Sequence, residues 1–487
     1  MKKSFTLTLL LVLLAQLTFA QRPFAELPID AQNISRMLAA TNSTGDVCML
    51  TFGTINTDFV VIDGKGQAVA SGAYPFNFSS GSTVLGTLGL PGSFLFFDKA
   101  QQEETKIQPY RIDRNTGAFT ALASLQAVPD PKSKLVRAFN ADGKLYMLFI
   151  NKKTNTLYLS IFKDEQAPEV RTYALEDKHM YDRLFKNGEI QVMEPGMDQS
   201  MYSTYYINKV YTYPDSLVLT FDLFENPDAP NRGALTTELL TLDLHQDKSS
   251  FRKLPYLLTM KGLTFNSYLH QGNVYRFIIT KQSLQLQVHN LATDKTQKHY
   301  YYTQEDAIGI MTAGVFRAGT ANSWSPHPDT LQNTAKVLRK MGNGYPATVV
   351  QHLEAGKVQL LVGTYEVQQS KNSTVASSVG RGIASAAGPA AIPLMMAGLA
   401  MQVTSYTLAD GAGVSTYFQS ILTSDTKEPA QASPRGSLQD EVRDFENSLE
   451  VQKTKMGGAI LYSYQGQAHY AYLDKKLKKL VITSFPK

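Results

Sequence analysis

The chain has 487 residues, of which 18% are charged, and it contains 25 tyrosines and 24 phenylalanines. The formal charge is only +5, and basic and aromatic residues are interleaved along the whole chain, which argues against a nucleic-acid-binding patch. The length fits either about three domains or one large repeat array, and the many short apolar runs rich in aromatic residues favour a strand-rich array.

The first 20 residues have the order of parts of a secretory signal peptide. Lys2 and Lys3 form a positive head, residues 5–14 are almost wholly apolar, and Thr18–Ala20 is a small-x-small cleavage site. The apolar stretch is shorter than the roughly 20 residues that a membrane-spanning helix needs, so a retained anchor is the weaker alternative. No cysteine stands at the cleavage site, which leaves a lipoprotein unsupported. We expect a mature chain from about Gln21 that is periplasmic, outer-membrane associated or extracellular.

Residues 21–44 are interpreted as an N-terminal lead-in, followed by one domain over residues 45–487. Cys48 is the only cysteine and lies between apolar neighbours. This context predicts a buried strand thiol that forms no disulfide within the chain. Residues 60–70 and 110–121 each have a strand–turn–strand pattern with Asp, Asn and Gly in the turn.

Four sites share a turn followed by a strand. These turns contain Gly143, Gly272, Gly356 and Gly466. Further strands follow after polar turns, such as residues 284–288, where apolar and polar residues alternate as in a half-buried strand. The first three glycines are 129 and 84 residues apart, distances that divide into units of 42 or 43 residues. Units of roughly 40 to 50 residues are typical of β-propeller blades.

At this repeat level the chain resembles irregular β-propeller proteins from about residue 45 to its end. The resemblance implies an all-β fold, a single irregular β-propeller of about seven blades with short helical insertions. A β-sandwich array and a two-domain β protein are the alternatives. No Trp-Asp pair marks the units, and the only tryptophan, Trp324, lies in a Ser/Pro-rich stretch. The resemblance therefore implies an architecture and no active site.

The first of two helix-like insertions covers residues 322–345. Leu331, Ala335 and Leu338 share one helix face, and Gly342 is placed to end the helix. We expect a helix packed on the rim of the sheets.

The second helix-like insertion covers residues 424–452. Ser437 and Asp440 have the spacing of a capping box, which predicts a helix start. The apolar face of this helix consists of Val442, Phe445 and Leu449. We expect this helix also to pack on the rim.

A third insertion, residues 370–402, replaces a short turn and is rich in Gly, Ala and Ser, with no charged side chain from Gly382 to Ala409. Its large apolar side chains are Ile383, Ile392, Leu394, Met395, Met396, Leu399 and Met401. Full exposure of these side chains to water would be unfavourable. The segment therefore plugs the propeller channel, contacts a membrane or a partner, or is mobile. Pro389 and Pro393 disfavour a continuous spanning helix.

No catalytic or metal-binding motif stands out. Ser250 and Lys253 match Ser-x-x-Lys without its companion motifs. The histidines are scattered, and His469 occupies a position held by tyrosine in other units, which predicts packing. Residues 140–143 and 226–231 carry oxygen ligands for calcium without the full loop spacing. We predict no cofactor and no metal.

Three functions remain open on this sequence. The leading hypothesis is a secreted or envelope-associated, non-enzymatic binding or scaffold protein with an unknown protein or glycan ligand. The second is a propeller hydrolase or lyase acting on carbohydrate or peptide, with catalytic residues brought together from separate blades. The third is a peripheral membrane protein attached through residues 382–401.

Overall fold

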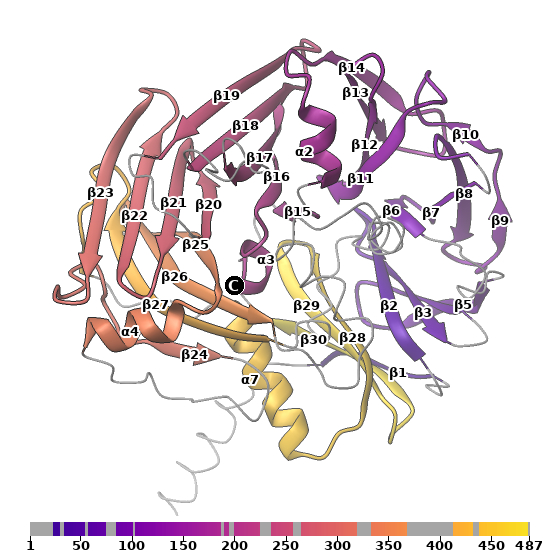
Figure 1. The fold of residues 1–487 in the computed structure, drawn as a ribbon. Helices are drawn as coiled ribbons and strands as arrows, with labels where there is room; N and C mark the ends of the chain where they lie inside the picture. Colours follow the sequence, from indigo (N-terminus) through magenta and orange to yellow (C-terminus); the bar gives the residue numbers. More distant parts are fainter. Residues whose placement is uncertain are drawn as a thin grey trace, which may run out of the picture.

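The strands of this chain form seven sheets. The computed structural model describes residues 23–29, 34–53, 57–74, 84–100, 103–186, 189–193, 199–224, 235–256, 264–318, 333–367, 413–431 and 438–485. Within these ranges each sheet has four or five strands, and Figure 1 shows the sheets following one another around a ring. The chain is therefore a single irregular β-propeller, as the sequence predicted, and we number its blades 1 to 7 in chain order.

Blades 1 to 3 come from the first third of the chain. Blade 1 comprises β2 (Ile34–Thr41), β3 (Val47–Gly53), β4 (Thr57–Ile62) and β5 (Ala68–Tyr74). Blade 2 comprises β6 (Val84–Leu90), β7 (Ser93–Lys99), β8 (Lys106–Asp113), β9 (Phe119–Ala121) and β10 (Leu125–Gln126). Blade 3 comprises β11 (Lys134–Ala141), β12 (Lys144–Asn151), β13 (Thr156–Phe162) and β14 (Glu169–Ala174). All pairings within these three blades are antiparallel.

Blades 4 and 5 follow, and blade 4 has an extra strand. Blade 4 comprises β15 (Ile190–Met193), β16 (Asn208–Thr212), β17 (Ser216–Phe224), β18 (Leu235–Asp243) and β19 (Ser249–Pro255). Blade 5 comprises β20 (Thr264–His270), β21 (Asn273–Ile279), β22 (Ser283–Asn290) and β23 (Lys295–Thr303). The extra strand β15 pairs with β16 in parallel, so the chain must cross back between them, and it does so through residues 194–207.

Blades 6 and 7 depart most from a simple meander. Blade 6 has the strand order β24 (Phe316–Ala318), β27 (Gly413–Thr423), β26 (Lys357–Val367) and β25 (Tyr345–Leu353). Blade 7 has the order β1 (Pro23–Pro28), β30 (Lys479–Phe485), β29 (Gln467–Asp474) and β28 (Met456–Tyr464). Blade 7 therefore joins the two ends of the described chain, and β1 closes the ring by pairing with β30.

The strand β1 and the strand β2 both lie in the range 21–44, which the sequence analysis set apart from the propeller. The difference has a physical reason. Pro23 and Pro28 limit β1 to an edge position, where a missing backbone N–H is tolerated. Such a short edge strand, flanked by prolines, has no hairpin partner nearby in the sequence to reveal it. Its partner β30 lies at the far end of the described chain.

The turns between first and second strands repeat in four blades. Asp142–Gly143, Gln271–Gly272, Ala355–Gly356 and Gln465–Gly466 all have positive φ angles at both residues, from 45° to 74°. Two such residues between antiparallel strands form the type I′ turn, which matches the twist of a hairpin and favours glycine at its second position. The four glycine-marked turns of the sequence analysis are therefore confirmed.

A second turn type joins the third and fourth strands of several blades. It begins with a side chain whose oxygen accepts hydrogen bonds from backbone N–H groups two to four residues later. The residues in this position are Asp63, Asp113, Asp243 and Asn290. The same kind of Asp or Asn turn therefore joins these strands in blades 1, 2, 4 and 5.

The inferred unit of 42 or 43 residues is wrong. Gly272 and Gly356 mark consecutive blades, blades 5 and 6, although 84 residues separate them, and only blade 4 lies between those of Gly143 and Gly272. The arithmetic failed because connections of different lengths, including α3 and α4, lie between the strands. The number of blades agreed with the expectation even though the unit length did not.

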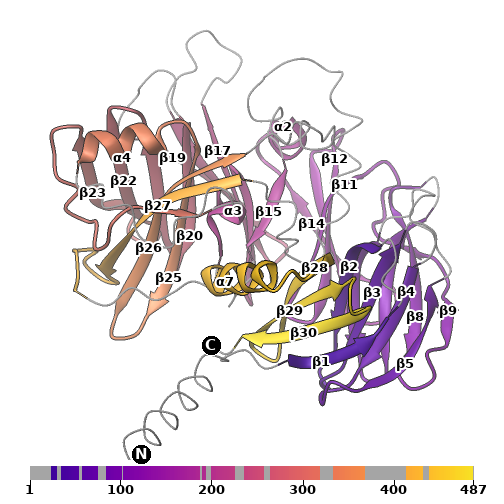
Figure 2. The same cartoon turned by 90° about the horizontal axis from the view of Figure 1, so that it is seen from below.

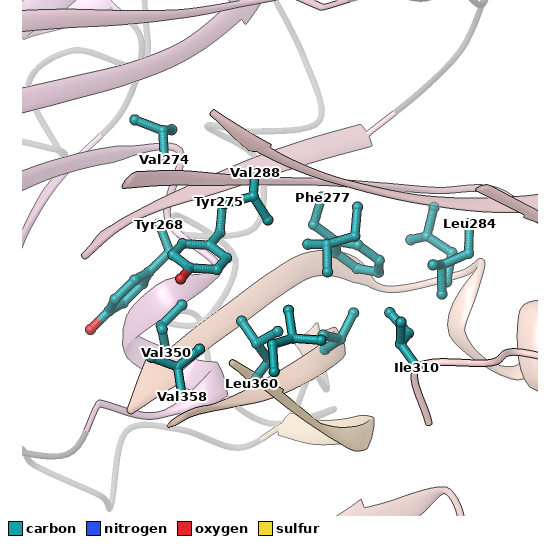
Figure 3. Packing of buried hydrophobic residues seen from close by; sticks show 14 of the residues in the cluster. Tyr268, Val274, Tyr275, Phe277, Leu284, Val288, Ile310, Val350, Val358 and Leu360 are labelled. Atoms are coloured by element: carbon teal, nitrogen blue, oxygen red, sulfur yellow. The ribbon is translucent and has the colours of Figure 1, made fainter. Parts of the chain in front are cut away.

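Apolar side chains fill the space between neighbouring blades. The largest buried cluster joins blades 4, 5 and 6, and Figure 3 shows Tyr275, Phe277 and Leu284 of blade 5 facing Val350 and Leu360 of blade 6. Other clusters join blade 7 to 1, 1 to 2, 2 to 3 and 3 to 4. Because burial of apolar area stabilises at roughly 25 cal/mol per Å², these interfaces hold the ring together.

The junction between blades 6 and 7 is built differently, and we call it the seam. In the described part of the chain, the facing sides of these blades belong to two separate clusters. One side packs against α3 (Met201–Thr204), and the other against α7 (Leu438–Val451). Figure 2 shows α7 between the strands of blade 6 and those of blade 7. Helical segments thus occupy a place where the other blades pack sheet against sheet.

The two predicted helices are present, and α2 (Met180–Lys186) and α3 are additional. The helix α4 (Thr334–Met341) ends at Gly342 as predicted, but it is capped by Asn333, and Leu331 lies outside the described residues. In α7, Val442 and Leu449 are buried and Phe445 packs beside them, which confirms the predicted apolar face. Ser437 lies outside the described residues. No helix among the described residues is both long and apolar enough to cross a bilayer.

Candidate functional site

The seven apolar residues singled out in the third insertion lie outside the described residues. These are Ile383, Ile392, Leu394, Met395, Met396, Leu399 and Met401. The structure does place the two strands that this insertion connects. β26 and β27 pair along their whole length, from Lys357 opposite Thr423 to Val367 opposite Gly413. Residues 368–412 therefore link two adjacent antiparallel strands, where blades 1, 3, 5 and 7 have a short turn.

The candidate site lies at the inner edge of blades 4 to 6 and is built around α3. Figure 1 shows α3 near the middle of the ring. The helix begins after Ser200, whose hydroxyl oxygen accepts a hydrogen bond from the Ser203 backbone N–H (2.8 Å), while the Ser203 hydroxyl accepts from the Ser200 N–H (2.9 Å). This reciprocal cap stabilises a helix of only one turn, which would not persist without tertiary contacts.

Aromatic rings cover α3 on the side of blade 6. Tyr205 stacks on Tyr365 with ring centroids 5.0 Å apart, and it contacts Tyr206 at 4.4 Å. Tyr202 meets the edge of Tyr365 at 5.4 Å. Burial raises the pKa of the Tyr205 and Tyr206 hydroxyls above their usual value. These tyrosines therefore stay neutral at physiological pH and act as packing groups with polar ends.

Lys209 is the central polar residue of the site. It lies on β16 with no exposed surface, and its Nζ donates to the backbone oxygen of Tyr206 and to Asn266 Oδ1 (2.7 Å). Asn266 on β20 in turn donates from Nδ2 to the backbone oxygens of Tyr205 (2.9 Å) and Tyr206 (3.3 Å). Burial lowers the pKa of the Lys209 ammonium to about 8, against an opposing attraction from Asp222. The Lys209 ammonium of blade 4 is thus hydrogen-bonded both to blade 5 and to the segment that follows α3.

Asp222 provides a second link between blades 4 and 5. Its Oδ1 accepts from the Thr237 hydroxyl (2.7 Å), and its Oδ2 accepts from the backbone N–H (2.7 Å) and hydroxyl (2.9 Å) of Ser267. Burial raises the pKa of this carboxyl, while Lys209 and these hydrogen bonds lower it. A buried carboxylate is tolerated when several donors surround it, and Asp222 meets that condition.

Arg276 on β21 completes the interface between blades 4 and 5. Its Nη1 donates to the backbone oxygens of Leu254 (3.1 Å) and Pro255 (2.9 Å), and its guanidinium lies 4.6 Å from the centroid of the Tyr256 ring. Both carbonyls belong to β19, the outer strand of blade 4. From a middle strand of blade 5, the Arg276 guanidinium therefore supplies hydrogen-bond donors to two backbone carbonyls on the outer strand of blade 4. It also makes a cation–π contact with Tyr256.

These groups differ in what they can do chemically. A lysine with a pKa near 8 could exchange protons near neutral pH, and burial shifts the pKa of the Asp222 carboxyl upward. Both are fully buried, however, and their hydrogen-bonding atoms contact other parts of the same chain. Sequence reasoning missed the site because Lys209 and Asn266 are 57 residues apart. A signal was present, since Lys209 is a cation inside the buried strand Asn208–Thr212.

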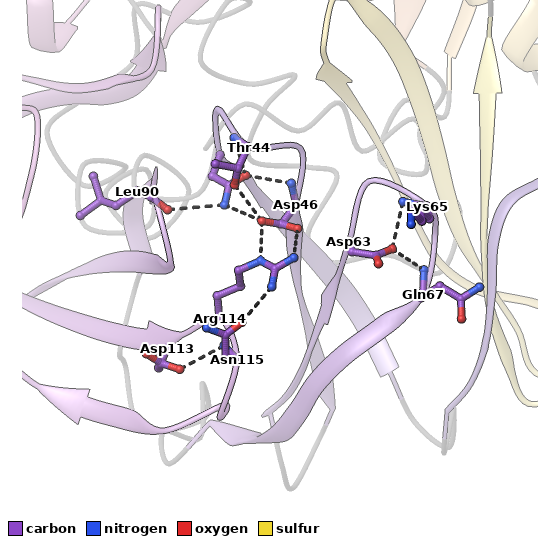
Figure 4. A network of polar contacts seen from close by, with 10 residues as sticks. Thr44, Asp46, Asp63, Lys65, Gln67, Leu90, Asp113, Arg114 and Asn115 are labelled. Carbon is purple, nitrogen blue, oxygen red and sulfur yellow. Dashed lines mark hydrogen bonds and ion pairs between the residues drawn. The ribbon is translucent and has the colours of Figure 1, made fainter.

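A separate polar network joins blades 1 and 2 (Figure 4). Arg114 donates from Nε and Nη2 to the two carboxylate oxygens of Asp46, each at 2.7 Å. Asn42 and Thr44 also donate to Asp46 Oδ2, at 3.0 and 2.9 Å. The hydrogen bond from Arg114 is the main cause that lowers the pKa of Asp46 to about 2. Such bidentate pairs are among the stronger charge-assisted contacts.

The remaining residues of the sequence analysis serve packing or structure. Cys48 is fully buried on β3, and burial raises the pKa of its thiol. His469 stacks on Tyr462 and meets Tyr464 edge to face, so the packing role is confirmed, and burial lowers its pKa to about 4. Within the described ranges, no group of three His, Cys, Asp or Glu side chains could hold a metal ion.

Two further candidates also have structural partners. The amide of Asn140, one of the oxygen ligands considered for calcium, bonds across to the backbone of Thr87 and so links blades 2 and 3. The other calcium candidate, residues 226–231, lies outside the described residues. Ser250 and Lys253 lie on the outer strand β19, and the Lys253 ammonium is 3.3 Å from Glu238 Oε1.

No protein-family model matches the chain, and no curated protein matches it. Among solved structures, the chain is similar to the Dos1 propeller, at 8% identity and a TM-score of 0.34 over 96% of this chain and 95% of that one. It is also similar to Drosophila plexin A in complex with semaphorin 1b (8%, TM-score 0.29, covering 96% and 87%) and to a prolyl endopeptidase (9%, 0.29, covering 90% and 46%). The resemblance is to propellers in general and to no specific family.

Proposed function

We propose that this chain is an exported, non-enzymatic binding or scaffold protein whose ligand is a protein or a glycan. Its place is the periplasm, the outer membrane or the extracellular space, as the first 20 residues indicate. The observation that carries the proposal is the role of the buried ionisable groups between blades 4 and 5. Lys209, Asp222 and Arg276 all bind neighbouring blades, which favours a rigid frame over a reacting site.

A rigid frame suits recognition because it presents loops without an ordering penalty at the moment of binding. In a propeller, long connections between strands are the natural place for such recognition. Residues 225–234, between β17 and β18, and residues 368–412, between β26 and β27, are long connections of this kind. They join second to third strands, so both leave the same end of their blades. We place ligand contact at that end of the ring.

The test measures binding and turnover with the same protein preparation. The mature chain is incubated with isolated cell-wall sacculi and, separately, with a panel of chromogenic glycosides and peptides. We expect saturable sedimentation with sacculi or retention on a glycan array, and no release of reducing ends or amines. Turnover that follows the protein through purification would contradict the proposal. Cell fractionation of the full chain and of a variant lacking residues 1–20 tests export separately.

The alternative, a hydrolase or lyase, is favoured by one observation, the paired pKa shifts of Lys209 and Asp222. It is distinguished by Lys209→Met. If the panel reveals an activity, and this variant abolishes it while its circular dichroism and unfolding midpoint stay unchanged, Lys209 belongs to an active site. If binding persists in this variant without any turnover in the parent, the lysine is a structural link.

A further inference from the structure

Two connections at one end of blade 7 form a single surface. The first is the stretch 451–456, from the end of α7 to the start of β28, and the second is the turn 475–478 between β29 and β30. The backbone N–H of Lys475 donates to the backbone oxygen of Lys455 at 2.8 Å, and Met456 pairs with Asp474. In Figure 1 these connections are yellow loops at the lower edge of the ring. We call residues 451–456 and 475–478 the rim patch.

The rim patch exposes large apolar side chains. Val451 is 82% exposed, Leu477 60% and Met456 36%. In the described part of the chain only one other large hydrophobic residue, Tyr301, is exposed to a comparable degree. Single exposed apolar residues are ordinary. Three on two hydrogen-bonded loops form a cluster of the kind that marks an interaction site.

The same patch carries a concentration of positive charge. Its lysines are Lys453, Lys455, Lys475, Lys476 and Lys478, and all five are exposed. None of these five ammonium groups forms an ion pair with another described residue, whereas the adjacent Lys479 pairs with Glu26 at 2.9 Å. Residues 450–456 and 474–478 together have a formal charge of +3, with both acidic residues, Glu450 and Asp474, counted.

Two of the acidic residues near the patch, Asp474 and Glu446, bind other groups of blade 7. Asp474 is buried, and its Oδ1 accepts the backbone N–H groups of Lys476 (2.8 Å) and Leu477 (3.0 Å). Glu446 binds the Tyr470 hydroxyl at 2.5 Å. The exposed Asp444 precedes Val451 by seven residues, about 10 Å along a helix. Asp474 moreover fixes the turn, so Leu477 is held outward instead of folding back.

We propose that the rim patch docks the propeller onto a bilayer that contains anionic phospholipid. Lysines beside protruding apolar side chains match the two components of such a surface, anionic headgroups and acyl chains. A nucleic acid or a sulfated glycan would bind the lysines but would not bury the exposed side chains of Val451 and Leu477. The contact is peripheral, and it requires neither residues 382–401 nor the binding function proposed above.

Vesicle flotation tests this docking. The mature chain is mixed with vesicles of phosphatidylglycerol and phosphatidylcholine, or of phosphatidylcholine alone, at low and high salt. We expect binding to the anionic vesicles that weakens with salt, and little binding to the neutral ones. Each lysine near an anionic surface strengthens binding about fivefold. The triple variant Lys455→Gln, Lys475→Gln, Lys476→Gln should therefore bind on the order of 100-fold more weakly.

A matched control removes three lysines elsewhere. Lys65, Lys248 and Lys295 are exposed; the first two lie in the turns between third and fourth strands of blades 1 and 4, and Lys295 begins β23 directly after that turn in blade 5. In an antiparallel blade these turns lie at the opposite end from a turn between second and third strands, such as 475–478. Changing all three to glutamine removes the same charge and should alter binding less than threefold. Equal losses in the two triple variants would show a nonspecific charge effect and overturn the proposal.

The apolar side chains are tested separately. Val451→Ser with Leu477→Ser should weaken vesicle binding at least fivefold without changing retention on heparin. A fluorophore on the thiol introduced by Leu477→Cys should shift to the blue with anionic vesicles, and Cys48 does not compete because it is fully buried. If the serine variant binds vesicles as the parent does, or if the fluorophore stays in water, the patch is only a polyanion site. If deleting residues 370–402 abolishes flotation and the rim variants do not, the rim proposal is wrong.

Discussion

The buried ammonium of Lys209 makes the stability of the folded protein depend on pH. Burial lowers the pKa of its ammonium from 10.5 to about 8 in the folded protein. Between these values the unfolded chain binds more protons than the folded one, so stability rises with pH. An acid with a lowered pKa has the same sign, because its unfolded form also binds more protons than its folded form between the two pKa values. Below pH 8 the loss of hydration of the buried ammonium opposes folding. Its hydrogen bonds to Tyr206 and Asn266 offset part of that cost.

The free energy of unfolding measured in urea at several pH values tests this effect. From pH 7 to pH 9.5, the parent should gain about 2 kcal/mol relative to Lys209→Met, which has no group to titrate. The difference between the two curves removes the tyrosine titrations that both proteins share. The same substitution at the exposed Lys65 should give a curve parallel to that of the parent. Parallel curves for Lys209→Met would contradict the assignment of the shift to this residue.

Asp46 gives a pH dependence of the same sign, but in the acid range. Its pKa is lowered from 3.8 to about 2 by Arg114 and its other donors, so its contribution to stability is present above pH 4 and is lost as the pH falls through 2. Asp46→Asn should lower the free energy of unfolding by about 1–2 kcal/mol at pH 7, allowing for the partial exposure of Arg114. Asp63→Asn is the control, because an amide oxygen can accept the same backbone hydrogen bonds. A loss at pH 7 that persists unchanged at pH 2 would speak against the ion pair.

At the scale of single elements, the turns show what local sequence could predict. Gly143, Gly272, Gly356 and Gly466 were identified because a type I′ turn demands glycine whatever surrounds it. Likewise Gly342 marks the end of α4, and an apolar stripe marks the buried face of α7. The inner-edge site could not be predicted in this way. Its contacts join residues that only the assembled ring brings together.

Two glycines test the difference between a local and a tertiary requirement. An added Cβ at Gly143 would meet no atom within 4 Å, so Gly143→Ala should cost only the strain of its positive φ, about 1 kcal/mol. At Gly89, by contrast, the Cβ would lie 2.0 Å from the backbone oxygen of Thr41 in blade 1. Gly89→Ala should therefore destabilise the protein clearly more than Gly143→Ala in urea unfolding. Equal losses would mean that blades 1 and 2 can separate at little cost.

The helix α7 is expected to depend on its buried face alone. Val442 is fully buried, and Val442→Ala should lower the free energy of unfolding by roughly 2 kcal/mol because it leaves a cavity. Val451 on the same helix is largely exposed, and Val451→Ala should change stability by less than about 0.5 kcal/mol. Similar losses at both positions would show that the end of α7 is packed in solution.

At the scale of the whole molecule, the sequence predicted the fold class and the approximate number of blades but not the length of each blade. Strand alternation and turn residues are local signals, whereas the position of a blade in the ring depends on connections of any length. For the same reason β1 was missed. Among the described strands its partner is β30, and nothing between residues 23 and 28 indicates pairing with a strand near residue 480.

Removal of β1 tests the closure of the ring. A chain that starts at residue 30 loses the pairs from Pro23 to Pro28 with β30, and Ala25 leaves the cluster that joins blade 7 to blade 1. We expect the free energy of unfolding to fall by roughly 2–4 kcal/mol, since each hydrogen bond contributes about 1 kcal/mol net. A chain that starts at residue 21 serves as the control. Identical urea midpoints would show that β1 adds nothing to the ring.

The pairing of β1 with β30 also fixes a time in the life of the molecule. During synthesis the segment 23–28 leaves the ribosome long before residues 479–485 exist, so blade 7 cannot form until residue 485 has been added. Contacts between such distant segments form late, because loop closure opposes them. Until then blade 1 presents the apolar surface of Val60 and Ile62 without the sheet that covers it. Newly made chains therefore pass through a stage in which this exposed surface favours aggregation. A chaperone or rapid completion of folding would prevent it.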